Sequence, residues 1–143
     1  MADIFTKEKR SEVMSKIKSE SMLEKAFAKE LSKIVYPLGY RYRLNYKNAP
    51  GRPDIAFVSR KLAVFVDGDF WHGYKFAERK AKLKQAYWLE KIQTNIRRDK
   101  RNRRKLKKNG WTYIRIWEHD VKKALGKSLK RITDALEAAD RKA

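Results

Sequence analysis

The apolar positions of two segments recur every three or four residues, which is the spacing of one face of a helix. They are Leu23, Phe27, Leu31, Ile34 and Leu38 in the first segment, and Leu125, Leu129, Ile132, Leu136 and Ala139 in the second. We therefore expect a helix over about 21–38, stopped by Gly39, and a closing helix over about 126–141. Residues 6–17 carry a weaker helical pattern, which predicts a separate, earlier helix.

Between these helices lie segments with the alternation, or the β-branched and aromatic content, that is typical of strands. These segments are residues 40–46, 54–58, 61–67 and 111–117, and Ser59-Arg60 predicts a hairpin between the second and the third. A long helical region, roughly 78–108, precedes the last strand and ends at Asn109-Gly110. The order is helix, three strands, helix, strand and closing helix. It predicts a single α/β (or α+β) domain over residues 1–143, with helices packed on a mixed sheet.

The formal net charge of +20 indicates a polyanionic partner, because so much positive charge would otherwise repel itself in a compact fold. Nucleic acid is the usual partner, since phosphates that meet Lys or Arg release counterions; an anionic membrane is the alternative. The sequence has no apolar run of transmembrane length and no secretory signal. It has no cysteine, which excludes disulfides and thiolate zinc sites. We expect a soluble, cytoplasmic protein that binds nucleic acid and no membrane.

Much of the positive charge lies in one segment. Residues 75–108 contain fifteen Lys or Arg and three acids, Glu78, Glu90 and Asp99. A charge run of this kind is often only a solvated helix face. Here opposite charges four residues apart are nearly absent, and like charges at that spacing repel. The segment is therefore predicted to contact phosphates.

Two acids lie at strand ends in this basic chain. With a two-residue loop at Ser59-Arg60, Asp54 pairs with Phe65, and Asp67 falls on the same side of the sheet as Asp54. Such diagonal neighbours lie about 7–8 Å apart at Cα, within reach of a shared metal ion. Mg²⁺ takes hard oxygen ligands and commonly uses one or two carboxylates. The alternative is that both acids are ordinary turn and strand-end residues.

Three sequence blocks resemble the very-short-patch-repair (Vsr) mismatch endonucleases, which belong to the PD-(D/E)XK nuclease superfamily. The blocks are PGRPDIAF, AVFVDGDFWHG and YWLEKIQTNIRRDKRNRRKLKKNGWTYIRIWE, and the opening TKEKRSEVMSKI matches the family's N-terminal segment. The likeness covers about residues 6–120. It implies an α-β-β-β-α-β core, which agrees with the element order, and it divides the chain into an N-terminal DNA-contacting arm (1–18) and a nuclease core (19–143).

The resemblance implies a catalytic site and its metal. Asp54 matches the Mg²⁺-binding aspartate, and the carbonyl of Val66 matches a further ligand. His72 matches the histidine that acts on the attacking water or the scissile phosphate, while Glu24 and Asp99 match acids that complete the site. We add Asp67 as a catalytic and metal-binding candidate from its position beside Asp54. The expected cofactor is Mg²⁺, for which Mn²⁺ can substitute.

Each of these residues also has an ordinary structural interpretation. Ser21 and Glu24 have the spacing of a helix capping box. His72 could be a core histidine bonded to a carbonyl. Asp99 shares a semi-apolar helix face with positions 88, 92 and 95, which predicts that it points inward; the ordinary alternative is an ion pair with a nearby Arg.

The resemblance also implies DNA contacts. Phe70, Trp71 and Trp88 match aromatic residues that wedge between base pairs, and Met14 matches an apolar residue of the arm over the minor groove. Adjacent aromatic residues are more often simply core. From the basic helical segment we expect further contacts by Asn95, Arg97, Arg98, Arg101, Arg103 and Arg104.

The chain departs from the best-known members of this family, which hold a structural zinc with cysteines and histidines. Asp69 and His119 stand at two of the cysteine positions, and the histidine run after FWH is missing. We expect these two residues to form a hydrogen-bonded ion pair or to sit with polar neighbours, and we expect no structural zinc. Asp67 replaces the family's other histidine. Asp69 also occupies the place of the lysine that the superfamily usually has two residues after the second acid.

The resulting hypothesis is a monomeric, Mg²⁺-dependent endonuclease that nicks double-stranded DNA at or near a T:G mismatch. In very short patch repair its partners would be mismatch-repair proteins and a cognate cytosine methyltransferase system. One alternative is a related nuclease of restriction, defence or mobile elements that cuts matched DNA. The others are a catalytically dead DNA-binding module and a basic RNA-binding protein.

Overall fold

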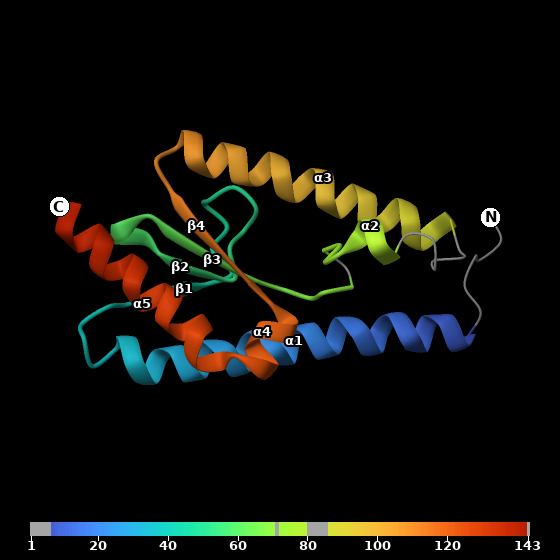
Figure 1. The fold of residues 1–143 in the computed structure, drawn as a ribbon, viewed down its shortest axis with the longest axis horizontal. Helices are drawn as coiled ribbons and strands as arrows, with labels where there is room; N and C mark the ends of the chain where they lie inside the picture. The colour runs from blue at the N-terminus through green and yellow to red at the C-terminus, as the bar shows by residue number, and fades with distance from the viewer. Residues whose placement is uncertain (1–6, 71, 80–85, 143) are drawn as a thin grey trace.

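A four-stranded mixed sheet forms the centre of the protein (Figure 1). The structure, a computed structural model, describes residues 7–70, 72–79 and 86–142, with the side chains of residues 7–20, 79 and 86 excepted. The strands are β1 (Arg43–Leu44), β2 (Ile55–Phe57), β3 (Leu62–Asp67) and β4 (Thr112–Trp117), in the spatial order β1-β2-β3-β4. The first three are antiparallel neighbours, whereas β4 runs parallel to β3.

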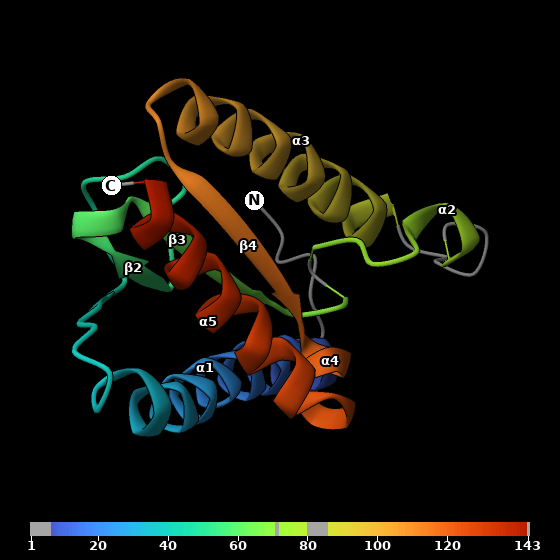
Figure 2. The same cartoon turned by 60° about the vertical axis from the view of Figure 1, so that its left-hand side comes forward.

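Helices cover both faces of this sheet. They are α1 (Lys7–Val35), α2 (Phe76–Arg79), α3 (Ala86–Lys108), α4 (Glu118–Lys123) and α5 (Leu125–Lys142). Figures 1 and 2 show α3 on one side of the sheet, with α1 and α5 on the other. The parallel pair β3–β4 requires a crossover, and the segment that contains α3 provides it. The expected α-β-β-β-α-β order and the mixed sheet are thus confirmed, with α4 as an addition.

The N-terminal helices and the first strand differ from expectation. A single helix, α1, spans the region in which two helices, over 6–17 and 21–38, were predicted. No Gly or Pro interrupts residues 18–21, so the backbone hydrogen bonding continues through them. Because Ser21 lies inside a helix, the capping-box interpretation of Glu24 was wrong. The predicted strand 40–46 is paired only at Arg43–Leu44.

The predicted helix over 78–108 is present as α2 and α3, and residues 80–85 of it lie outside the described residues. Its expected end is confirmed. Gly110 has a φ of 83°, and the Trp111 amide donates a hydrogen bond of 2.9 Å to the Leu106 carbonyl. This is the left-handed turn that commonly closes a helix.

One face of the sheet packs against α1 and α5 and forms the larger core. Its β3 members are Leu62, Val64 and Val66, all buried. Phe27 and Leu31 of α1 lie on the other side of this core, together with residues of α5 such as Ile132 and Leu136. The apolar stripes that predicted these two helices are therefore the surfaces that bury them.

The opposite face of the sheet carries the polar residues that form the site. Ile55 pairs with Val64 and Phe57 with Leu62, so the register is the one predicted from the sequence. The connection is longer than two residues: Val58–Arg60 form a 3₁₀ turn, and Lys61 follows with a φ of 50°. This register puts Asp54 and Asp67 on the face that α3 covers, as expected. Among the described residues, no helix is both long and apolar enough to cross a membrane.

Candidate active site

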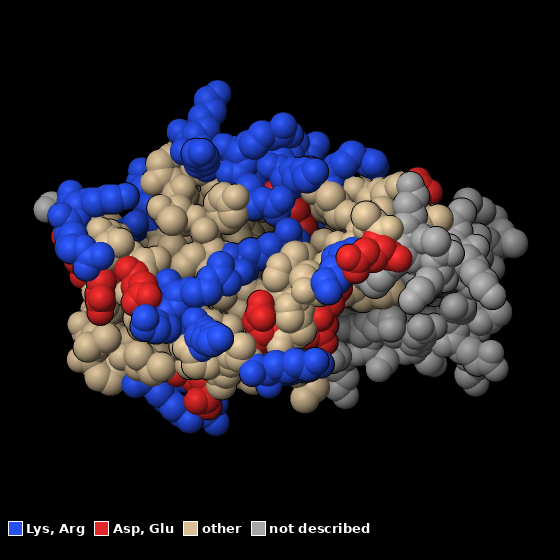
Figure 3. All heavy atoms as spheres, viewed as in Figure 1, with Lys and Arg blue, Asp and Glu red and all other residues tan. Residues whose placement is uncertain are grey.

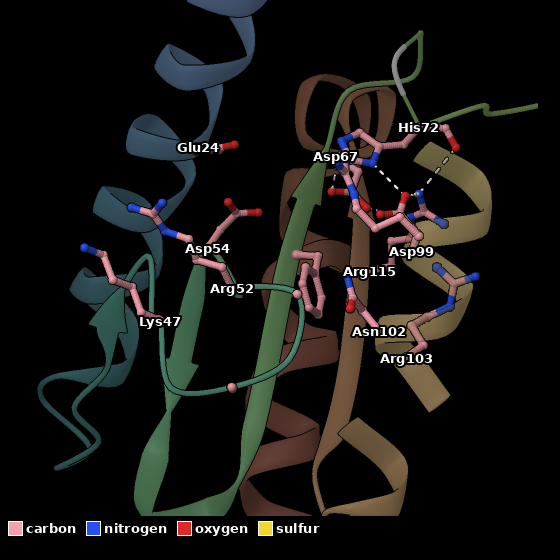
Figure 4. Close-up of a pocket in the computed structure, with 14 residues that line it drawn as sticks. Glu24, Lys47, Arg52, Asp54, Asp67, His72, Asp99, Asn102, Arg103 and Arg115 are labelled. Carbon is pink, nitrogen blue, oxygen red and sulfur yellow. Dashed lines mark hydrogen bonds and ion pairs between the residues drawn. The ribbon is translucent and has the colours of Figure 1, made fainter. Parts of the chain in front are cut away.

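A cavity of about 580 Å³ opens between α1, the turn before β2, the sheet and α3 (Figure 4). Its lining combines acids, one histidine and several cations. The lining residues are Glu24, Lys47, Ala49, Gly51, Arg52, Asp54, Phe65, Asp67, His72, Arg98, Asp99, Asn102, Arg103 and Arg115. All five residues proposed as catalytic from the sequence therefore line the same cavity.

Asp54 is held at the cavity by its own turn and by β3. Its Oδ2 accepts a hydrogen bond of 2.7 Å from the amide of Val66. Gly51 has a φ of 81°, and a Cβ there would lie 3.1 Å from the Cβ of Asn102, so this turn passes close to α3. Figure 4 shows Glu24 of α1 projecting towards Asp54. The turn formed by the GRPD motif thus positions the Asp54 carboxylate at the cavity.

His72 lies between two carboxylates that come from different elements. Its Nδ1 is 2.8 Å from Asp99 Oδ2 on α3, and its Nε2 is 3.6 Å from Asp67 Oδ1 at the end of β3. Asp99 follows Trp88, Ile92 and Asn95 on the inward face of α3; those three are buried, and Asp99 is half-buried. The inward placement of Asp99 that the spacing predicted is confirmed.

Arg115 joins the same two carboxylates from β4. Its Nε donates to Asp67 Oδ2 at 2.6 Å, and its Nη2 donates to Asp99 Oδ2 at 3.1 Å. The Arg alternative for Asp99 therefore holds as well: this carboxylate contacts both a histidine and an arginine. Together the four side chains make one connected network beside Asp54.

The two carboxylates of this network have opposite pKa shifts. Burial raises the pKa of Asp67, against the lowering effect of the His72 and Arg115 charges. Burial also pushes the pKa of Asp99 upward, but the hydrogen bond from His72 and the charges of His72, Arg115 and Arg98 outweigh it, so this pKa lies below its usual value. Asp99 is thus the ionised partner that fixes the orientation of the His72 ring.

The chemistry of these donors fits a divalent metal ion. Among the described residues, Asp67, His72 and Asp99 each offer a ligand atom, and these atoms lie within 4.8 Å of one another. Asp54 adds a carboxylate on the same face of the sheet, and Val66, whose carbonyl was expected to be a ligand, is tied to it by the amide hydrogen bond. Carboxylate and carbonyl oxygens are the ligands that hard divalent cations prefer.

Cations surround the cavity and continue along α3. Lys47, Arg52, Arg98 and Arg103 line the cavity itself. Figure 3 shows Lys and Arg gathered over the α3 edge of the molecule. The exposed members on α3 include three further predicted contacts: Arg97, Arg101 and Arg104. A cavity with acids at its base and cations at its rim suits a phosphodiester that is held while it reacts.

Comparison with known proteins identifies the family. The family model described as DNA mismatch endonuclease Vsr matches residues 2–78, more than half of the chain. The chain belongs to the Vsr family. It is therefore a DNA endonuclease of the PD-(D/E)XK superfamily, and this membership indicates a divalent metal ion at the site.

Individual relatives match over most of their lengths. The chain is 42% identical over 123 residues to the type II nicking enzyme V.NmeDIP of Neisseria meningitidis serogroup C, covering 85% of this chain and 81% of the relative. It is 36% identical over 143 residues to the type II nicking enzyme V.NmeAIP of N. meningitidis serogroup A, covering 95% and 100%. It is 31% identical over 119 residues to the DNA mismatch endonuclease Vsr of Escherichia coli K12, covering 82% and 74%.

Of the aromatic residues expected to enter DNA, the structure describes Phe70 and Trp88. Phe70 packs edge-on against Trp88, with ring centroids 5.3 Å apart, and Trp88 is 5% exposed. To reach a base step, Trp88 would have to leave this packing. Trp71 and the side chain of Met14 lie outside the described residues. Asn95, also expected to bind DNA, is buried, and its Oδ1 accepts a hydrogen bond from Arg98.

The predicted pairing of Asp69 with His119 is confirmed. His119 Nδ1 lies 2.9 Å from Asp69 Oδ1, and the His119 ring stacks on Tyr74 with centroids 4.2 Å apart. Glu118 accepts a hydrogen bond from the Asp69 amide at 3.2 Å. In this Vsr-family chain, polar contacts therefore join the two segments at the cysteine positions of better-known members.

Sequence reasoning missed Arg115, together with Lys47, Arg52 and Asn102 of the cavity. A signal for Arg115 was present. It is the only charged residue in the strand TYIRIW, and alternation puts it on the face opposite Ile114 and Ile116. That signal could be used only once β4 was known to lie parallel to β3, with Arg115 opposite Phe65.

Gly73 of the FWHG motif should be sensitive to substitution. Its φ is 76°, and a Cβ there would lie 2.5 Å from Cδ1 of Ile96 on α3. Gly73→Ala should therefore lower the free energy of unfolding by about 1–3 kcal/mol and slow cleavage, since His72 is its chain neighbour. Gly126→Ala on α5 is the matched control: nothing lies within 4 Å of its Cβ, and the added methyl should stabilise by about 0.5–1 kcal/mol. Thermal melts and cleavage rates of both variants test this; unchanged values for Gly73→Ala would contradict it.

Proposed function

We propose that this Vsr-family endonuclease is a Mg²⁺-dependent enzyme that nicks one strand of duplex DNA at or near a T:G mismatch, as in very short patch repair. One observation carries the proposal. His72 lies between Asp99 and Asp67, next to Asp54, in a cavity with a cationic rim. The arrangement supplies a proton acceptor, metal ligands and phosphate contacts within one site.

His72 is the proposed general base. An ionised Asp99 at 2.8 Å accepts a hydrogen bond from Nδ1–H, which leaves the lone pair of the neutral imidazole on Nε2. Nε2 lies on the Asp67 side, 3.6 Å from Oδ1. A water that attacks phosphorus can pass its proton to this nitrogen, and the nearby carboxylates then stabilise the imidazolium that forms.

Asp54, the carbonyl of Val66 and the Oδ1 atom of Asp67 are the proposed metal ligands. When bound, Mg²⁺ would neutralise charge on the phosphate oxygens and lower the pKa of an attacking water. The oxygen-rich donor set favours Mg²⁺, and Mn²⁺ would substitute because it accepts the same hard ligands. Glu24, which projects from α1 towards Asp54, would hydrogen-bond to water at this end of the cavity.

The cations at the rim would hold the duplex without regard to its sequence. Lys47 and Arg52 flank the cavity on the side of the turn before β2, while Arg98 and Arg103 flank it from α3. Such contacts set the position of the backbone over the reacting groups. One such site in a monomeric, single-domain chain cuts one strand at a time, and relatives named as nicking enzymes support this mode.

Mismatch selection is assigned to the aromatic residues beside His72 and to the N-terminal arm. Phe70 and Trp71 directly precede His72, so a base step that they enter must neighbour the scissile phosphate. A wobble mismatch lowers the cost of unstacking, which favours wedge insertion there. Trp88 would support Phe70 from α3, and Met14 of the arm (residues 1–18) would lie over the minor groove.

A T:G mismatch also indicates the partners that we propose. Deamination of 5-methylcytosine leaves thymine opposite guanine, so a cognate cytosine methyltransferase system would create the substrate. Mismatch-repair proteins would then act at the nick. The E. coli relative named as a DNA mismatch endonuclease supports this assignment.

Cleavage of matched duplex panels tests the function. T:G-mismatched and fully paired duplexes of one sequence, labelled on each strand in turn, are incubated with Mg²⁺ or with EDTA. We expect a single nick on the T strand of the mismatched duplex, with Mg²⁺ only. Equal cutting of paired DNA would instead favour a restriction or defence nuclease, and binding without cutting would favour a DNA-binding module.

The rim cations predict how binding depends on salt. Replacing Arg103 and Arg104 by alanine should weaken binding to all duplexes alike and reduce the slope of log K against log salt by about 1–2. Lys127 and Lys130, exposed on α5 across the sheet, provide a control that removes the same charge. Titrations at several salt concentrations measure both slopes. Equal slopes for the two double variants would remove α3 from the DNA interface.

A further inference from the structure

The cluster formed by Asp67, His72 and Asp99 has the composition of a metal site. Its ligand atoms lie within 4.8 Å of one another. Asp67 is only 6% exposed, and Asp99 is half-buried. Carboxylates withdrawn from water need a countercharge, because a buried charge without a partner is strongly destabilising. A bound metal ion or a cationic side chain can neutralise the cluster while both carboxylates stay ionised.

Arg115 is that cationic side chain. Its guanidinium contacts Asp67 Oδ2 at 2.6 Å through Nε and Asp99 Oδ2 at 3.1 Å through Nη2. Nη2 also lies 3.4 Å from the carbonyl of His72, so all three members of the cluster touch it. The guanidinium stacks over Trp117, 4.1 Å from the ring centroid. An arginine keeps its charge at any pH at which the protein is folded.

The fold holds Arg115 at this place. In the parallel ladder of β3 and β4, Arg115 lies opposite Phe65 and Trp117 lies opposite Asp67, so Arg115 and Asp67 share one face of the sheet. The carbonyl of Arg115 accepts a hydrogen bond of 3.0 Å from Arg131 Nη1 on α5. The side chain thus starts from the edge strand β4, whose backbone is bonded to α5 on the opposite face of the sheet.

We propose that Arg115 is a positioning residue that occupies the place of a metal ion in the Asp67–His72–Asp99 cluster and confines divalent ions to the Asp54 end of the cavity. Its donors take one oxygen of each carboxylate, and its charge repels a second cation at short range. Asp54, whose Oδ2 bonds to the Val66 amide of the same strand pair, lies on the other side of Asp67 (Figure 4). The inference rests on the active site proposed above.

Loss of the Arg115 charge should let the cluster bind a divalent ion, which loss of the Arg115 packing alone should not do. The two carboxylates would lose the guanidinium that contacts both of them, and a divalent ion is the natural replacement. Arg115→Met, similar in length but uncharged, should therefore create a metal site. Arg115→Lys retains the charge and should not create one.

Counting bound Mn²⁺ by electron paramagnetic resonance, without DNA, tests this. The background is Asp54→Asn, so that any ion detected lies away from Asp54. This variant alone, and with Arg115→Lys, should bind no Mn²⁺, whereas Asp54→Asn with Arg115→Met should bind about one ion per chain. Adding Asp99→Asn to that double variant should remove the ion, because Asp99 belongs to the cluster and not to the proposed ligands at the Asp54 end. Circular dichroism establishes that each variant is folded.

Two results would overturn the proposal. One is a folded Asp54→Asn/Arg115→Met variant that binds no Mn²⁺. The other is an ion that Asp54→Asn binds and that Asp99→Asn removes, because the cluster would then hold metal despite Arg115. This second comparison decides the matter even if the Arg115→Met variant does not fold. Neither readout involves cleavage, so a protein that fails to nick mismatched DNA would refute the proposed function without changing these counts.

Discussion

Asp54→Asn should slow nicking by at least about 10³-fold, because metal stabilisation of a phosphoryl transition state amounts to several kcal/mol. Asparagine keeps an oxygen that can accept the 2.7 Å hydrogen bond from the Val66 amide, so the fold should be maintained. DNA affinity should stay equal or rise, since one negative charge near the phosphates is lost. Single-turnover nicking and an equilibrium binding titration measure the two effects separately.

Two further variants identify the cause of this loss. Asp54→Ala should also abolish cleavage, but it leaves the Val66 amide without its acceptor and should lower the free energy of unfolding by about 1–3 kcal/mol. Asp134→Ala removes an exposed acid on α5 and should leave the nicking rate unchanged. A wild-type rate in Asp54→Asn would exclude Asp54 as the metal anchor.

His72→Ala should slow nicking by about 10²–10⁴-fold, the usual contribution of a positioned proton acceptor. The acidic limb of the pH–rate profile should disappear with it, because that limb reports protonation of the base. Asp99→Asn should also slow nicking, because the ring loses the charge 2.8 Å away that holds the proton on Nδ1 and stabilises the imidazolium.

The second histidine of the chain is the matched control for His72. His119 pairs with Asp69 and stacks on Tyr74, outside the cavity lining, so His119→Gln should retain most of the nicking rate. Thermal melts measure what each substitution does to folding. If His72→Ala changed the melting temperature and left the rate and its pH profile intact, His72 would be a structural histidine.

The sequence by itself determined the class of the fold, and with the family resemblance it identified five residues that line the candidate site. Apolar spacing located the faces of α1 and α5, and the turn expected at Ser59-Arg60 gave the register that pairs Ile55 with Val64. These features are local, since each depends on the period of a helix or strand and on the identity of a turn. The positions of Asp54 and Asp67 on one face of the sheet followed from that register.

Other features could be read only from the tertiary structure. The pattern suggested two N-terminal helices, but α1 is continuous, and residues 18–21 contain no Gly or Pro that would interrupt it. The close packing of Phe70 against a buried Trp88 depends on where α3 lies relative to the loop that follows β3. The Phe70–Trp88 contact is not determined by residues that are neighbours in the chain.

Arg115 illustrates the difference most directly. As one basic residue among 37 Lys and Arg, it carries no distinguishing mark beyond its place in an apolar strand. Its contacts with Asp67 and Asp99 arise because the crossover through α3 returns the chain parallel to β3, which brings residues 48 and 16 positions apart together. Sequence patterns identify which side chains can carry charge, whereas the pairing of distant strands decides which of those charges meet.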